Sequence, residues 1–256
     1  MMASLPTISP ERLLDILNSD VQPEAKTFER RYVMRKGYAV KSELKEDQFI
    51  VHPNGDVIKP FWPRERLHNE FATLRFLQEH TKITVPQHWL FIHDSVLHLA
   101  TERILDAVPV YELPESKVDA ATEAVAEQVQ EHILPQLRAI TRATIGSIVP
   151  DIAVFPPSRL YCYDHRPWES IRSEPDTPFV LCHNDLGPQN IFADPDTYEI
   201  KYIIDWEFAG FFPERFEIPL WTIKSREERA AMCEETRARD LAPWGLTVEE
   251  INTSTR

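Results

Sequence analysis

The segment CHNDLGPQNIF, residues 182–192, places a histidine, an aspartate and an asparagine between two apolar runs. His183, Asp185 and Asn190 follow the spacing H-x-D-x-x-x-x-N. In phosphoryl transfer, an aspartate on a rigid loop orients and deprotonates the attacking hydroxyl, and a nearby asparagine binds a metal ion through its amide oxygen. The spacing therefore predicts that Asp185 is a general base and that Asn190 is a metal ligand.

A second aspartate, Asp205, follows the strand-like run IKYII. Its place at the end of a neighbouring strand predicts that it completes a metal site with Asn190. Oxygen ligands of this kind suit Mg²⁺, with nucleotide phosphates supplying the rest of the coordination shell. Aspartate and asparagine taken singly are most often turn residues. The combination of these residues with Asp185, between hydrophobic strands, favours the catalytic interpretation.

Two other chemistries are disfavoured by spacing. Cys182 and His183 are neighbours on an extended run, so their side chains point to opposite faces and do not pair easily as nucleophile and base. His88, His93 and His98 are five residues apart, which suits neither one helical face nor one strand face for a zinc site.

Glu70 stands out in the N-terminal half because it falls on a predicted apolar helix face. Residues 64–80 have the helical spacing of apolar side chains, and Glu70 lies within that stripe. A carboxylate there is costly without a partner, and Lys59, at the end of the run DVIKPF, is the expected one. Protein kinases use a strand lysine held by a helix glutamate to bind nucleotide phosphates. A purely structural ion pair and a Glu70 that reaches solvent remain alternatives.

Strands and one hairpin are predicted around that helix. Residues 31–42 and 96–104 have the composition of strands, and the dipeptide Asn54-Gly55 predicts a hairpin within residues 47–61.

The second half has a different character. Residues 116–146 are rich in alanine and glutamate and predict helices, with a break or kink at Pro135. Residues 149–178 are proline-rich and irregular. The runs NIFAD and IKYIIDWEF predict a hairpin around DPDTYE, and a polar helical tail follows. Strands with one helix first, and mostly helices later, indicate two α+β lobes joined near residues 103–108.

Composition excludes several classes of protein. The 256 residues carry a formal net charge of −13, which disfavours nucleic-acid binding and is compatible with a cationic substrate. Three separated cysteines predict no disulfide framework and a reducing compartment. The N-terminal residues lack the pattern of a secretory signal, and no stretch approaches eighteen apolar residues. We therefore expect a cytoplasmic, monomeric protein without membrane or nucleic-acid partners.

The motifs HNDLGPQN and IIDWEFAG resemble the two signature loops of the aminoglycoside phosphotransferase and choline kinase-like family. The run VIKPFWPRERLHNEFATLRFL resembles the lysine strand and glutamate helix of its fungal-type members, and FFPERFEIPLW resembles its tail. The resemblance covers roughly residues 30–225. It implies an α+β, bilobal protein kinase-like fold, with a small β-rich N-lobe containing one key helix over residues 1–103 and a larger, mainly helical C-lobe over residues 104–256.

The resemblance also implies roles for residues of the second lobe. Asp185 would be the catalytic base, and His183 would support the loop that carries it. Asn190 and Asp205 would bind Mg²⁺.

For the first lobe, the resemblance implies that Lys59, held by Glu70, contacts the α- and β-phosphates of ATP. Residues 102–104, from Glu102 to Ile104, would form a hinge whose backbone binds adenine. The implied activity is ATP-dependent transfer of the γ-phosphate to a hydroxyl of a small molecule.

Two features depart from the family pattern. The chain has only six glycines, and no G-x-G-x-x-G precedes Lys59, so we expect SELKED or another glycine-poor turn within residues 36–56 to cover the phosphates. About fifty residues follow Asp205, so residues 107–178 must supply much of the acceptor site. These departures keep open the alternative of a catalytically weak pseudokinase that binds a nucleotide or a partner.

The acceptor is not defined by the sequence. Glu207, Glu214 and Glu217 follow the second motif, and acids near the cleft would favour an amine-bearing, cationic acceptor. A third hypothesis, an acidic scaffold with coincidental motifs, would have to explain several spaced motifs at once.

Overall fold

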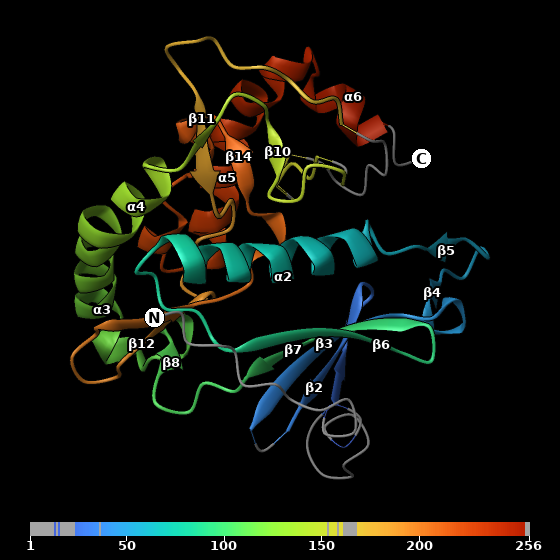
Figure 1. Ribbon diagram of the computed structural model, residues 1–256, viewed down its shortest axis with the longest axis horizontal. Helices are drawn as coiled ribbons and strands as arrows, with labels where there is room; N and C mark the ends of the chain where they lie inside the picture. The colour runs from blue at the N-terminus through green and yellow to red at the C-terminus, as the bar shows by residue number, and fades with distance from the viewer. Residues whose placement is uncertain are drawn as a thin grey trace.

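The computed structural model describes residues 13, 15, 24–35, 37–152, 154–157, 159–160 and 168–253. Within this part of the chain, a five-stranded sheet forms one end of the molecule, and helices with two smaller sheets form the other (Figure 1). Helix α2 (Pro63–His80) lies between them. No helix of the described residues is long and apolar enough to cross a membrane.

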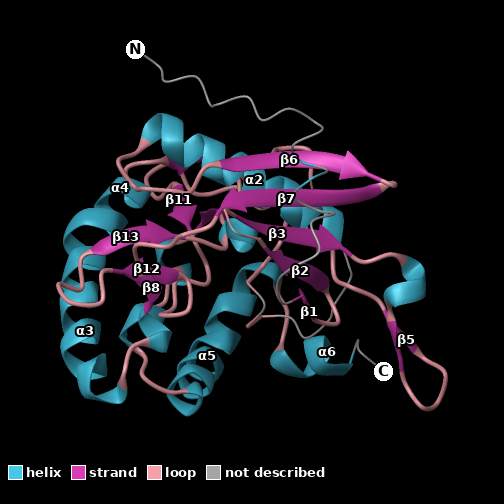
Figure 2. Ribbon diagram, turned by 90° about the horizontal axis from the view of Figure 1, so that it is seen from below, coloured by secondary structure: helices cyan, strands magenta, loops and turns pink. Residues whose placement is uncertain are grey.

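The five-stranded sheet is antiparallel throughout and has the order β1-β2-β3-β7-β6 (Figure 2). On one face Val33, Val40 and Ala100 form a small core, and on the other Leu97 and Leu99 pack against α2. The strands predicted within residues 31–42 and 96–104 are thus confirmed. The bounds of the strands are β1 (Glu24–Lys26), β2 (Arg30–Met34), β3 (Tyr38–Glu43), β6 (His88–His93) and β7 (Val96–Glu102).

Helix α2 connects the two parts of the molecule. Its first helical residue is Pro63, whose fixed φ suits that position and whose missing N–H would be unpaired there in any case. Leu67 packs against the sheet, whereas Leu74 and Leu77 enter the large core of the C-terminal part. Glu70 is 2% exposed, so the prediction that it lies on the apolar face is confirmed.

The hairpin predicted around Asn54-Gly55 is also present. It consists of β4 (Ile50–Val51) and β5 (Val57–Ile58), and it projects from the body of the molecule beside the start of α2 (Figure 1). Its residues are largely exposed.

The helical segment after residue 114 contains three parts. Helix α3 (Glu115–Gln128) continues through a π-helical turn (Val129–Ile133) into α4 (Leu134–Arg138). The wider turn lies directly before Pro135, which cannot donate the next helical hydrogen bond. The helix is therefore locally irregular before Pro135 but does not break at it, and it does not extend to residue 146, because the chain enters β9 (Thr141–Arg142).

Two small sheets frame the two sequence motifs. The first has the order β10 (Gly146–Ser147), β14 (Gly210–Phe212), β11 (Phe179–Cys182) and β9. The second has the order β13 (Ile200–Ile203), β12 (Ile191–Ala193) and β8 (Val108–Pro109), and β12 with β13 is the second predicted hairpin. A Cβ atom at Gly210 would lie 2.6 Å from the carbonyl oxygen of Gly146, so this pairing requires glycine. Helices α5 (Arg226–Leu241) and α6 (Val248–Thr253) complete the chain.

Candidate active site

Lys41 links the sheet, α2 and the second motif. Its ammonium group lies 2.7 and 2.8 Å from the two carboxylate oxygens of Glu70 and 2.6 Å from Oδ1 of Asp205. Burial opposes its charge, but the attraction of Asp205 and Glu70 prevails and raises the pKa of Lys41 above its ordinary value. Lys41 therefore remains a cation beside two carboxylates from distant parts of the chain.

The prediction that Lys59 pairs with Glu70 is wrong. Lys59 is exposed and follows the projecting strand β5, whereas both oxygens of Glu70 are bonded to Lys41. The strand β5 is short and exposed, so the residue that follows it does not reach the buried face of α2. The missed signal is the run YAVK, residues 38–41, on the third strand of the sheet, which is similar to the V-A-I-K strand of protein kinases.

Glu207 joins the same region from the turn after Asp205. Its Oε2 lies 2.5 Å from Nη2 of Arg30 on β2, and its Oε1 lies 3.3 Å from Nη1 of Arg66 on α2. Asn69 adds hydrogen bonds of 3.0 and 2.8 Å to the carbonyl oxygens of Glu207 and Ala209. These contacts fasten the short helix η4 (Trp206–Phe208) to both the sheet and α2.

The carboxylates of Glu70, Asp205 and Glu207 lie within 4.8 Å of one another. Lys41, Arg30 and Arg66 balance them, so this cluster is an ion-pair network. Burial favours the neutral acid, yet Arg30 and Arg66 lower the pKa of Glu207 to about 2. Asp205 has a left-handed backbone, with φ of 65°, which turns the chain from β13 into η4.

The first motif forms the loop between β11 and β12. Nδ1 of His183 accepts the N–H of Asp185 at 3.2 Å, so its Nε2 is the nitrogen that donates to the carbonyl oxygen of Ile204, at 2.9 Å. Burial lowers the pKa of His183, which agrees with a neutral ring. Asn190 donates to the backbone oxygen of Asp185 at 2.9 Å and to its Oδ2 at 3.3 Å. His183 thus ties the loop of Asp185 to the strand that ends at Asp205.

Glu217 holds the backbone at the start of this loop. Its Oε2 accepts hydrogen bonds from the backbone N–H groups of His183 and Asn184. Burial raises the pKa of Glu217 to about 7 against these hydrogen bonds. Because Glu207 and Glu217 are held inside the protein and Glu214 is paired with Arg138 at 2.9 Å, the hypothesis that these acids bind an amine is not supported.

Asp185 is paired with an arginine that the sequence interpretation missed. Nη2 of Arg229, on α5, lies 2.5 Å from Oδ1 of Asp185. Burial raises the pKa of Asp185 above its ordinary value, while Arg229 acts in the opposite direction. The carboxylate is thus held by Arg229 on one side and by Asn190 on the other.

A cavity of about 440 Å³ adjoins Lys41, and we call it the Lys41 cavity. The predicted hinge lines it through Glu102 and Ile104, whereas Lys59 is not among its lining residues. Ser42, Glu43, Lys45 and Asp47 of the SELKED segment line a different cavity, so the prediction that this segment covers the site is not supported. The other residues that line the Lys41 cavity include Tyr32, Val40, Lys41, Glu70, Leu74, Thr101, Ala107, Phe192, Ile204 and Asp205.

The donor atoms suit a hard metal ion. Nδ2 of Asn190 is engaged with Asp185, and among the described residues nothing donates to its Oδ1. Lys41 donates to Oδ1 of Asp205, and no described residue donates to Oδ2, which is therefore available to bind a metal ion. The backbone N–H of Ile204 also donates to the carbonyl oxygen of Asn190 at 3.0 Å, which joins the two segments. An amide oxygen and a carboxylate oxygen are the ligands that Mg²⁺ prefers.

Residues 117–218 match the model of the phosphotransferase enzyme family, a segment that contains Asp185, Asn190 and Asp205. Over these residues the chain is similar to that family. The family resemblance inferred from HNDLGPQN and IIDWEFAG is therefore confirmed.

Two known proteins show further similarity to this chain. Ethanolamine kinase 2 of Rattus norvegicus is 32% identical over 75 residues, which are 29% of this chain and only 18% of that protein. The crystal structure of a thermostable mutant of aminoglycoside phosphotransferase APH(4)-Ia superimposes with a TM-score of 0.50 and 17% identity, covering 91% of this chain and 84% of that one. The second likeness shows the fold, and the predicted α+β, kinase-like architecture is confirmed.

Proposed function

We propose that this protein transfers the γ-phosphate of ATP to a hydroxyl group of a small molecule. The observation that supports this most directly is the convergence of Lys41, Glu70 and Asp205 next to the loop of Asp185 and Asn190. Phosphoryl transfer depends on positioning and on charge stabilisation, and these residue types supply both.

The Lys41 cavity is the proposed nucleotide site. Its wall at residues 102–104 would hold adenine, because the N–H groups of Glu102 and Arg103 are bonded to Gln87 and Gly37 whereas the N–H of Ile104 has no acceptor among the described residues. Lys41 replaces Lys59 as the proposed ligand of the α- and β-phosphates. The proposed N-terminal nucleotide-binding lobe is residues 1–103, and residues 104–256 form the catalytic lobe.

In the proposed reaction, Asp185 accepts the proton of the acceptor hydroxyl. The acceptor oxygen forms a bond with the γ-phosphorus, and the bond from that phosphorus to the bridging oxygen breaks, which leaves ADP. Asn190 and Asp205 would hold Mg²⁺, which supplies positive charge to the phosphates. Lys41 adds a second positive charge from the sheet side.

A pseudokinase is the second candidate function. One observation favours it: Arg229 is paired with Asp185, the proposed base. The two candidates differ in whether γ-phosphate reaches an acceptor. The deciding experiment incubates the protein with Mg²⁺ and γ-labelled ATP and follows label transfer to alcohols, sugars, hydroxy acids and amino alcohols. Label in an acceptor product supports the enzyme, and tight Mg·ATP binding without transfer to any of them supports the pseudokinase.

The replacement of Lys59 by Lys41 as the proposed phosphate ligand can be tested with a pair of variants. We expect Lys41→Met to weaken Mg·ATP binding by about 10-fold or more, since hydrogen bonds to charged groups contribute roughly 1.5–3 kcal/mol each. Lys59→Met removes the same charge from the exposed hairpin and should leave the dissociation constant unchanged. Isothermal titration calorimetry with both variants measures the effect. Equal loss in both variants, or loss only in Lys59→Met, would contradict the assignment of Lys41.

The metal assignment predicts that nucleotide affinity depends on Mg²⁺ through Asp205. We expect wild-type protein to bind ATP more tightly with Mg²⁺ than with EDTA, and Asp205→Asn to lose most of that difference, because one of two protein ligands no longer carries charge. The measurement is ATP titration with and without Mg²⁺. A variant that keeps the full Mg²⁺ effect would show that Asp205 is not a ligand.

A further inference from the structure

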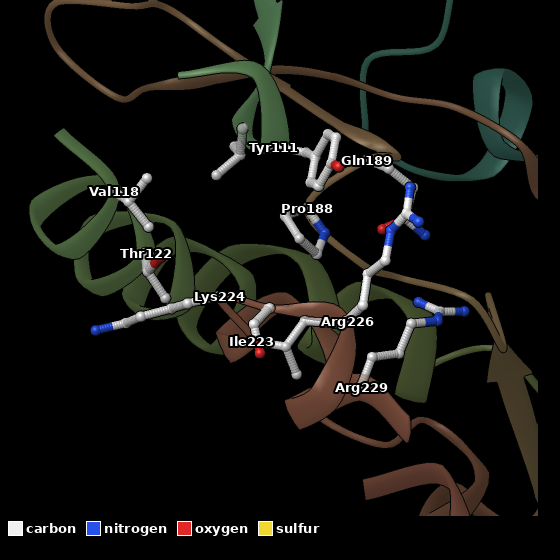
Figure 3. A pocket seen from close by; sticks show the side chains of 11 residues that line it. Tyr111, Val118, Thr122, Pro188, Gln189, Ile223, Lys224, Arg226 and Arg229 are labelled. Carbon is white, nitrogen blue, oxygen red and sulfur yellow. The ribbon is translucent and has the colours of Figure 1, made fainter. Parts of the chain in front are cut away.

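A second cavity, of about 460 Å³, adjoins the catalytic loop and is not the Lys41 cavity. We call it the Arg226 cavity (Figure 3). Pro188 and Gln189 of the loop that carries Asp185 form part of its wall, and the start of α5 forms another. Its apolar lining comes from Val110, Tyr111, Val118 and Ile223. A volume of this size suits a small organic molecule.

The charges of the Arg226 cavity have one sign. Lys224, Arg226 and Arg229 line it, and no aspartate or glutamate does so in the described part of the chain. This contrasts with the whole chain, whose net charge is −13. In Figure 3 the side chain of Arg226 reaches towards Gln189, whereas Lys224 points away from the loop. The positive charge is therefore concentrated at the end of the cavity next to the catalytic loop.

Arg226 is exposed, and Arg229 has one buried donor without an acceptor among the described residues. No carboxylate is paired with Arg226 among the residues that the structure describes. Arg229 bonds Asp185 through Nη2, but its Nη1 is buried and has no acceptor there. A buried donor without an acceptor costs free energy, and a bound anion would remove that cost.

We propose that the Arg226 cavity is the acceptor site and that the acceptor is an anion, with a carboxylate or phosphate group close to its reactive hydroxyl. This inference rests on the proposed function and concerns its substrate class. The anionic group binds Arg226 and Nη1 of Arg229, the apolar body lies against Val118 and Ile223, and the hydroxyl faces Asp185. A cationic acceptor would meet Arg226 and Arg229 at this end of the cavity, where the carboxylate of Asp185 is already paired with Arg229.

Three probes that differ only in one terminal group test the charge preference. Mandelate, 1-phenyl-1,2-ethanediol and 2-amino-1-phenylethanol share a phenyl body and a hydroxyl, and they carry negative, zero and positive charge. Binding is measured by ligand-observed NMR, without nucleotide. We expect mandelate to bind at least about 10-fold more tightly than the amine, because its carboxylate can form a charge-assisted hydrogen bond with an arginine.

Two variants with the same change of charge locate the effect. Arg226→Glu should abolish the preference for mandelate or reverse it, whereas Arg75→Glu, on the exposed surface of α2, should leave it intact. Overall charge changes equally in both, so a difference between them assigns the preference to the cavity. Circular dichroism melting checks that both variants are folded.

Three results would overturn the proposal: no binding of mandelate at millimolar concentration, equal or tighter binding of the amine, or displacement of mandelate by ATP at the Arg226 cavity. The last result would assign the arginines to the nucleotide phosphates. Because this experiment uses no turnover, it can fail while phosphoryl transfer is detected. Conversely, mandelate binding with the expected preference, together with a failure of all phosphoryl transfer, would refute the enzyme and keep the anion site.

Discussion

Asp185→Asn is expected to lower the rate of phosphoryl transfer by about 10²–10⁴-fold, the usual contribution of a general base. Asparagine has nearly the same size, its one amide oxygen can still accept from Arg229, and the hydrogen bond from Asn190 to the backbone oxygen of residue 185 does not involve the side chain. What it loses is the ability to accept a proton from the acceptor hydroxyl. Nucleotide affinity should change little, because Asp205, not Asp185, is in contact with Lys41 at the proposed phosphate site. Single-turnover kinetics with labelled ATP separates the chemical step from binding.

The matched control is Asp196→Asn, in the turn between β12 and β13. Asp196 is an exposed carboxylate paired with Lys117 at 3.0 Å, so its loss changes the net charge equally without touching the loop. Transfer at the wild-type rate by Asp185→Asn, with chemistry shown to limit turnover, would exclude Asp185 as the base. A fall of similar size in Asp196→Asn would show that the effect is not local.

The arrangement of the two motifs was predictable because its information is local. His183, Asp185 and Asn190 lie within eight positions of one another, and the strands on either side have clear apolar patterns. The hairpin that brings Asp205 back is also short. Spacing in sequence therefore fixed most of the relative positions of these side chains.

The lysine was not predictable from proximity. Lys59 is closer to Glu70 in sequence than Lys41 is, but the hairpin of β4 and β5 is an excursion from the main sheet. Only the pairing of β3 with β7 places Lys41 in the middle of that sheet, above the buried face of α2. A strand-pairing pattern is a tertiary property, and periodicity within one segment does not contain it.

The arginine partners were missed for the same physical reason. Arg30 and Glu207 are 177 positions apart, and Arg229 and Asp185 are 44 apart. Charged residues are exposed by default, so composition gives no reason to bury an arginine. Only the assembled fold shows that Arg30 is 1% exposed and requires a carboxylate.

Glu207→Gln is therefore expected to lower the free energy of unfolding by about 3–5 kcal/mol, the cost of removing one partner from a buried ion pair. Arg30 would lose its charged partner and keep its hydrogen bond of 3.1 Å to the carbonyl oxygen of Pro63, and Arg66 would keep Glu29. The matched control is Glu214→Gln, which breaks the exposed pair with Arg138 and should cost at most about 1 kcal/mol. Urea unfolding followed by circular dichroism measures both changes.

The pH dependence separates the charge of Glu207 from its packing. Its pKa in the folded protein is about 2, below the ordinary value of 4.5, so the unfolded chain binds more protons in that interval. The stabilisation is fully present above pH 4.5 and is lost as the pH falls towards 2. We expect the difference in unfolding free energy between wild type and Glu207→Gln to be largest near pH 7 and to shrink below pH 4.5. A difference that stays constant over this range would mean that Glu207 contributes through packing alone, and the ion-pair network would not be what fastens η4 to the sheet and α2.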